Sequence, residues 1–173
     1  MIPFVAVPIL TWIVHYPELE IDLDLAELAI TGKADESLRV VRSILDKLKL
    51  HSYLRNVWIP RCNPDEGVVS HIFELLHCSG VKRIMHLDVD EDINRPHSDK
   101  VIIEALAGHY IEELSWKKTD MCSSILTSAP TIQSVQLYSS GNHAVLRSWS
   151  AEDGLLSLPR VCSLFPHVPL CRI

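Results

Sequence analysis

The feature of this chain that most constrains its fold is a short apolar pattern that recurs from residue 54 onward. The pattern reads apolar-x-x-apolar-x-apolar, which is typical of a strand that buries one set of side chains. Successive copies begin about 26 residues apart, which leaves room for a helix between two strands. The copies are Leu54, Val57 and Ile59; Val81 and Ile84 with His86 in the third place; Ile111, Leu114 and Trp116; Ile132, Val135 and Leu137; and Leu158 and Val161 with Ser163 in the third place.

The stretches between the copies carry the signals of helix ends. Asn63 and Pro64 offer an N-cap and a first helical residue, and Gly80 can end that helix. Ser98 can cap a second helix, which Gly108 would close. Shorter helical stretches are expected from Thr119 or Asp120 to Pro130 and in the less regular arm from His143 to Leu156.

This alternation of strands and helices predicts an α/β fold with parallel strands, because each unit must bury its apolar side against the next. The period falls within the roughly 20–29 residues of leucine-rich repeats. We therefore predict a leucine-rich-repeat-like solenoid of strand-helix units. An open α/β three-layer sheet would give the same order of elements and stays the alternative.

Residues 1–53 are predicted to form a cap-like piece, and residues 54–173 the strand-helix repeat units. The last residues of the chain, 162–173, are expected to be irregular. Acidic and aliphatic residues alternate from Glu18 to Leu25, as in a strand with one wet face, and a helix with one apolar side is expected from Asp35 to His51. The apolar segment Ile2 to Val14 is too short for a membrane span, which needs about 20 residues, and it lacks the features of a secretory signal.

The composition is that of a folded domain. The 173 residues are 47% hydrophobic, and 16 Lys and Arg stand against 22 Asp and Glu, which gives a net charge of −6. This acidic balance argues against nucleic acid and anionic membranes as partners. The five cysteines form no C-x-x-C pair, so we expect reduced and mostly buried thiols in a cytoplasmic protein.

Three blocks of sequence resemble a known family. They are Arg-Pro-His-Ser-Asp-Lys from residue 95; the run from His109 that holds Ser-Trp-Lys-Lys-Thr-Asp; and the run from Ala129 that holds Ser-Gly-Asn-His-Ala-Val-Leu-Arg-Ser-Trp-Ser. In this order they are similar to the non-catalytic region that precedes the protease domain in filamentous-fungal, intracellular subtilisin-like multidomain proteins. The resemblance covers residues 80–161 and implies a protease-containing architecture, not protease activity in these residues.

Motifs for catalysis and metal binding are incomplete. A subtilisin-like triad needs Gly-flanked turns around its Asp, His and Ser, and none is present. Asp88, Asp90, Asp92 and Asp99 fit positions 1, 3, 5 and 12 of a calcium loop, but Ile93 stands where such a loop needs glycine. These aspartates are weak metal candidates, and a solvated acidic loop is the simpler interpretation.

The strand face of the predicted solenoid is the expected binding surface. The residues that project from it are predicted to be Trp58 and Pro60, Met85 and Leu87, Ser115 and Lys117, and Gln136 and Tyr138. Of these, Trp58, Met85, Lys117 and Tyr138 are the candidate partner-binding residues. The alternative is that these side chains pack beneath a flanking segment such as residues 1–30.

The sequence therefore predicts a non-catalytic protein-interaction or regulatory module of a fungal protein, without a cofactor, that binds another protein or domain. The alternative is a fragment of a subtilisin-like serine protease that lacks its catalytic domain. A third possibility, a small-molecule α/β enzyme, would place a ligand at the strand C-termini, and the missing Gly-rich turn argues against it.

Overall fold

The structure is a computed structural model of the chain. It describes residues 22–25, 39, 41–43, 45–46, 52–63, 67–152, 154–155 and 163–167.

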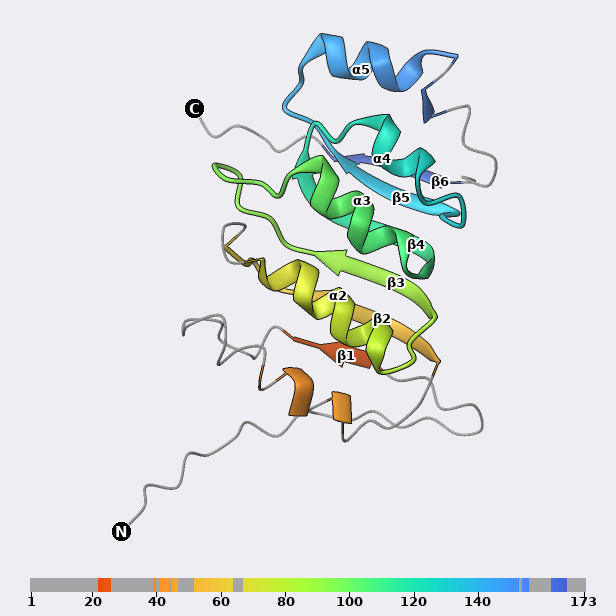
Figure 1. Ribbon diagram of the computed structural model, residues 1–173. Helices are drawn as coiled ribbons and strands as arrows, with labels where there is room; N and C mark the ends of the chain where they lie inside the picture. Colours follow the sequence, from red (N-terminus) through yellow and green to blue (C-terminus); the bar gives the residue numbers. More distant parts are fainter. Residues whose placement is uncertain are drawn as a thin grey trace.

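One six-stranded sheet runs through the described residues (Figure 1). All neighbouring strands are parallel, and their order in the sheet is their order in the sequence. The strands are β1 (Asp22–Asp24), β2 (Tyr53–Ile59), β3 (Arg83–Val89), β4 (Tyr110–Thr119), β5 (Ser134–Tyr138) and β6 (Ser163–His167).

Helices connect the strands from β2 to β5: α2 (Val68–Cys78), α3 (Asp99–Ala107) and α4 (Ser123–Thr127). A further helix, α5 (His143–Ser150), follows β5. Figure 1 shows α2, α3 and α4 side by side over one face of the sheet. In this layer α3 contacts both α2 and α4. The predicted α/β class with alternating helices and parallel strands is therefore confirmed.

The core lies between the sheet and this helix layer. Its sheet side consists of three rows of buried apolar residues, each row formed by residues that are in register on neighbouring strands. The helices contribute the other side, for example Val69, Ile72 and Leu76 of α2 and Ile102 and Leu106 of α3. The rows are Leu54, Ile84 and Ile111; Val57, Leu87, Leu114 and Val135; and Ile59, Val89 and Trp116. Leu137 of β5 is also buried, beyond a register shift in β4.

The register corrects the predicted pattern in β3. Leu54 is paired with Ile84, so the pattern in this strand starts at Ile84 and its third residue is Val89, not His86. The predicted start of the pattern, Val81, lies three residues too early in the sequence. The error arose because Val81 is also apolar and buried, although it lies in the turn after α2, where its N–H donates to the carbonyl of Leu76.

The same correction applies to the last strand. The predicted copy began at Leu158, but β6 spans Ser163–His167 and pairs Leu164 with Val135. The second residue of the pattern in this strand is therefore Leu164. Residues 156–162 lie outside the described residues.

Helix ends agree with the predicted signals in part. Ser98 caps α3 through its side chain, which accepts from the N–H of Val101, and Gly108 follows that helix as expected. The predicted cap at Asn63 is wrong, because α2 begins at Val68 after Gly67, whose φ of 62° suits glycine. Asn142, which the sequence pattern did not single out, caps α5 by accepting from the N–H of Ala144.

The predicted N-terminal elements are described only in part. In β1, Leu23 is buried between exposed Asp22 and Asp24, as the alternating pattern predicted. Within the helix predicted from Asp35 to His51, residues 39, 41–43 and 45–46 are helical, with Val41 and Leu45 buried. The segments 1–21 and 168–173 lie outside the described residues.

Candidate functional site

The candidate site is the face of the sheet that α2, α3 and α4 do not cover, which we call the open face. Because side chains alternate along a strand, the neighbours of the buried rows project to this side. The register aligns them in rows that cross the sheet. The rows are Asp22, Asn56, His86, Glu113 and Ser134, and Asp24, Trp58, Asp88, Ser115 and Gln136. Pro60, Asp90 and Lys117 lie beyond these rows toward the strand ends, and Tyr138 of β5 is in register with Thr119 of β4.

All four predicted partner-binding residues lie on strands of this sheet. Trp58, Lys117 and Tyr138 are each partly buried there. Met85 occupies a different row, next to β2, where the hydroxyl of Tyr53 donates to its sulfur at 3.7 Å. The three-residue shift in β3 puts Asp88 and Asp90 in the places expected for Met85 and Leu87, and Leu87 is fully buried in the core.

Ion pairs join neighbouring strands across the open face. On its β1 side, the guanidinium of Arg55 contacts Asp22 at 3.3 Å, and the side-chain amide of Asn56 donates to the same carboxylate at 2.8 Å. Further along, a ring nitrogen of His86 lies 3.1 Å from the carboxylate of Glu113. These contacts orient polar side chains that stay partly open to solvent.

Lys117 is the central cation of this face. Its ammonium lies 2.5 Å from Asp90, which directly follows β3, and 3.4 Å from Asp88 in that strand. Partial burial opposes the charged form, but the hydrogen bond to Asp90 and the charge of Asp88 outweigh it and raise the pKa of Lys117. Beside it, the hydroxyls of Ser115 and Tyr138 are hydrogen-bonded at 3.2 Å.

These contacts account for the acidic run that resembled a calcium loop. Asp88 and Asp90 bind Lys117, Asp92 accepts from the backbone N–H of Asn94, and Asp99 binds Lys118. Within the described parts of the chain, no three His, Cys, Asp or Glu side chains are placed to hold a metal ion.

A buried polar cluster supports the C-terminal end of β3. Glu91 and His97 are 4% and 1% exposed, and a ring nitrogen of His97 lies 2.9 Å from the Glu91 carboxylate. The other carboxylate oxygen accepts from the indole N–H of Trp116 at 2.5 Å. Burial alone would raise the pKa of Glu91, but the hydrogen bonds from His97 and Trp116 outweigh it and lower that pKa.

The three blocks that carry the family resemblance contact one another. Lys118 of the second block donates to the carbonyl of His97 in the first at 2.7 Å. Asp120 accepts from the N–H and hydroxyl of Ser140, at the start of the third block's Ser-Gly-Asn string. Trp149 of the third block is buried and donates to the carbonyl of Met121 at 2.8 Å, next to the second block. Their distinctive residues therefore hold the fold together.

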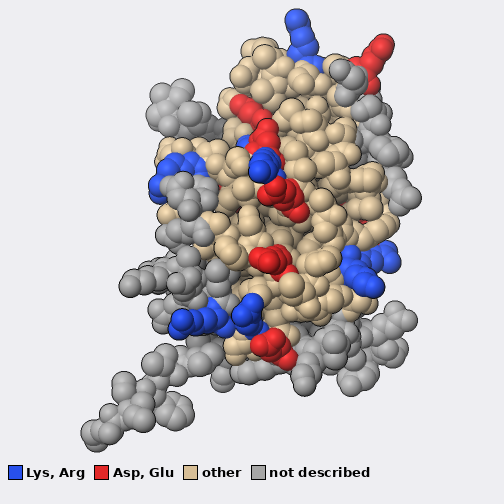
Figure 2. Space-filling view, in the orientation of Figure 1, with Lys and Arg blue, Asp and Glu red and all other residues tan. Residues whose placement is uncertain are grey.

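The opposite, helix side of the molecule, where α2, α3 and α4 cover the sheet, differs from the open face in its charge. Figure 2 shows this side, where a column of charged side chains crosses a mostly uncharged surface and further charged side chains lie near its edges. Between α2 and α3 lies a hollow of about 350 Å³, lined in part by Phe73, Ala105 and Gly108.

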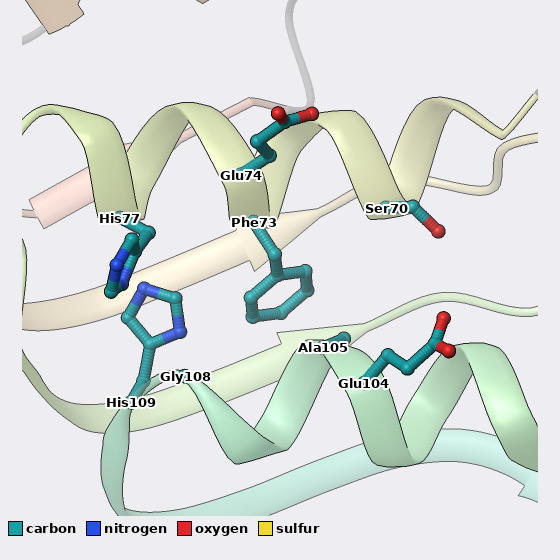
Figure 3. Close-up of a pocket in the computed structure, with 8 residues that line it drawn as sticks. All are labelled: Ser70, Phe73, Glu74, His77, Glu104, Ala105, Gly108 and His109. Carbon is teal, nitrogen blue, oxygen red and sulfur yellow. The ribbon is translucent and has the colours of Figure 1, made fainter.

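Two histidines close one end of this hollow. Figure 3 shows the rings of His77 and His109 next to each other, while Glu74 and Glu104 point away from them. The ring centroids of His77 and His109 are 6.1 Å apart, and both ring nitrogens of His109 are buried without a hydrogen-bond partner in this part of the structure. Burial lowers the pKa of His109, and the nearby His77 adds to this effect.

Other predictions concern the cysteines, the tryptophans and the membrane. The described cysteines are free thiols, but only Cys62 is buried, since Cys78 and Cys122 are exposed. Trp116, the third residue of its predicted apolar pattern, is a core residue, and so is Trp149. No helix in the described ranges combines the length and the apolar character that crossing a membrane requires.

Comparisons with protein-family models, with curated proteins and with solved structures each found no match.

Proposed function

We propose that this chain is a non-catalytic protein-binding module that binds another protein or domain through the open face. The observation that carries the proposal is the set of in-register rows on that face, where the partly buried Trp58 and Tyr138 flank charged residues. Large aromatic residues in such a setting are typical of protein interfaces.

The finer fold assignment is part of this proposal. A leucine-rich-repeat-like solenoid is supported by the sequential order of the parallel strands, the side-by-side helices and the apolar pattern in its corrected register. In such an array each unit contacts its neighbours and one strand face stays available to partners. An open three-layer sheet would instead carry helices on both faces.

A non-catalytic role is supported by the environment of the one described histidine-carboxylate pair in the core. His97 and Glu91 form a contact like that between a catalytic histidine base and the carboxylate that orients it, but both side chains are only 1% exposed. A substrate cannot reach them. The proposed place of the chain is the partner-binding region of a fungal, subtilisin-like protease architecture, in line with the resemblance of residues 80–161.

The test compares two double variants in affinity purification from the native cells, with quantified partners. Trp58→Ala with Tyr138→Ala truncates the open face, and His143→Ala with Leu146→Ala truncates exposed residues of α5. Specific partners should be lost with the first pair and retained with the second. Partners that stay unchanged with the first pair, while circular dichroism shows a folded protein, would refute the proposal.

A further inference from the structure

We propose that the segment bound by the open face is extended and rich in Lys or Arg. This inference rests on the proposed function and names the chemistry of the partner. It follows from the distribution of charge on the open face, from the way Lys117 is already held there, and from the aromatic residues beside it.

The open face is acidic. Among the described residues its carboxylates outnumber its cations, which are Arg55 at its β1 side, Arg83 on β3 and Lys117 at its centre. Arg55 pairs with Asp22, and Lys117 is shared between Asp88 and Asp90. The carboxylates are Asp22, Asp24, Asp88, Asp90, Glu112, which pairs with Arg83, and Glu113. A basic segment therefore complements this face, and an acidic one would be repelled.

Lys117 shows how a partner's ammonium group can be bound. Its Nζ atom lies between two carboxylates, at 2.5 Å from Asp90 and 3.4 Å from Asp88. Glu113, in the row next to it, has a side chain that is 53% exposed and contacts only the ring of His86 among the ion pairs of the described residues. Glu113 can therefore accept a cation from outside.

One aromatic side chain lies in the same row as two of these carboxylates, and a second lies close by. Trp58 is in register with both Asp24 and Asp88, and Tyr138 lies next to Ser115. A guanidinium group that stacks on an aromatic ring while it pairs with a carboxylate gains from both contacts.

The dimensions of the face fit a short extended segment. Strands are spaced about 4.8 Å apart, so the rows from β1 to β5 are about 19 Å long. This length corresponds to about six extended residues. The helix side presents a mostly uncharged surface between its charged side chains (Figure 2).

The test measures fluorescence anisotropy with two labelled peptides, one of alternating Arg and Ser and one of alternating Glu and Ser. Asp24→Asn with Glu113→Gln removes two charges from the open face. Glu74→Gln with Glu104→Gln removes the same charge from exposed positions on α2 and α3 and is the matched control.

The unchanged protein should bind the Arg-Ser peptide and not the Glu-Ser peptide, and added salt should weaken this binding. The open-face pair should weaken it about three- to tenfold, and the control pair should leave it unchanged. Absence of Arg-Ser binding, or an equal loss in both pairs, would overturn the inference. If the Trp58 and Tyr138 variants still lose their cellular partners in that case, the proposed function stands and only the basic partner is wrong.

Discussion

The indole N–H of Trp116 donates to the carboxylate of Glu91 at 2.5 Å, in a position where neither residue is exposed by more than 4%. His97 approaches the other carboxylate oxygen, and its ring lies edge-on to Trp116 with centroids 6.4 Å apart. This one carboxylate therefore anchors the loop after β3 to the centre of β4.

Replacing Glu91 by Ala should destabilise the fold strongly. The change leaves the buried donors of Trp116 and His97 without an acceptor, and loss of one partner from a buried pair costs about 3 kcal/mol. Urea denaturation followed by circular dichroism measures the free energy of unfolding. Glu104→Ala, at an exposed position of α3, is the control and should change it by less than about 0.5 kcal/mol.

The buried ring nitrogens of the half-buried His109 should make the fold sensitive to acid. Its pKa is lowered in the folded protein, so the unfolded chain takes up a proton first as the pH falls. This contribution to stability is complete above the unfolded pKa of about 6.5 and is lost as the pH falls from there toward the lowered folded pKa.

Urea denaturation of the unchanged protein and of His109→Gln, at several values between about pH 7.5 and pH 5.5, checks this prediction. The variant should lose less stability over this range, because glutamine does not titrate. His71→Gln is the control, since His71 is exposed on α2 and should leave the slope unchanged. Equal slopes for all three proteins would contradict the prediction.

Gly154 and Gly108 should respond in opposite ways to replacement by alanine. A Cβ atom at Gly154 would lie 2.3 Å from the carbonyl oxygen of Ser148 and 2.7 Å from that of Trp149, so the chain that follows α5 must shift. A Cβ atom at Gly108 would meet only His77, at 3.8 Å.

We expect Gly154→Ala to cost about 2 kcal/mol of unfolding free energy. Gly108→Ala should be neutral or should stabilise by about 0.5 kcal/mol, because alanine has less conformational entropy to lose on folding. Thermal melting of the two variants side by side measures the difference, and a stable Gly154→Ala variant would show that this turn is not tightly packed.

Replacing Lys117 by Met should increase the affinity of the open face for a basic segment. The change removes the cation that Asp88 and Asp90 share, which frees both carboxylates for a partner. We expect about threefold tighter binding of the Arg-Ser peptide and a change in unfolding free energy below about 1 kcal/mol, because the ion pair is partly exposed. Lys100→Met, on the helix side, is the control, and equal effects of both changes would argue for net charge alone.

The sequence by itself was sufficient for the order and type of the central elements. Strand and helix periods are local properties, and the buried Ile111, Leu114 and Trp116 follow the predicted pattern. Local patterns failed where two overlapping solutions existed. In β3, both Val81 and Ile84 could begin the apolar pattern, and only pairing with Leu54 on β2 selects Ile84.

The composition of the candidate site was decided by the tertiary structure. The register places Asp88 rather than Met85 beside Trp58, and it brings Lys117, distant in sequence, between two aspartates that had resembled a calcium loop. Likewise, nothing in their spacing links Glu91 to Trp116. These relations depend on which strands are adjacent and in which register, and a chain's local periodicity carries no information about either.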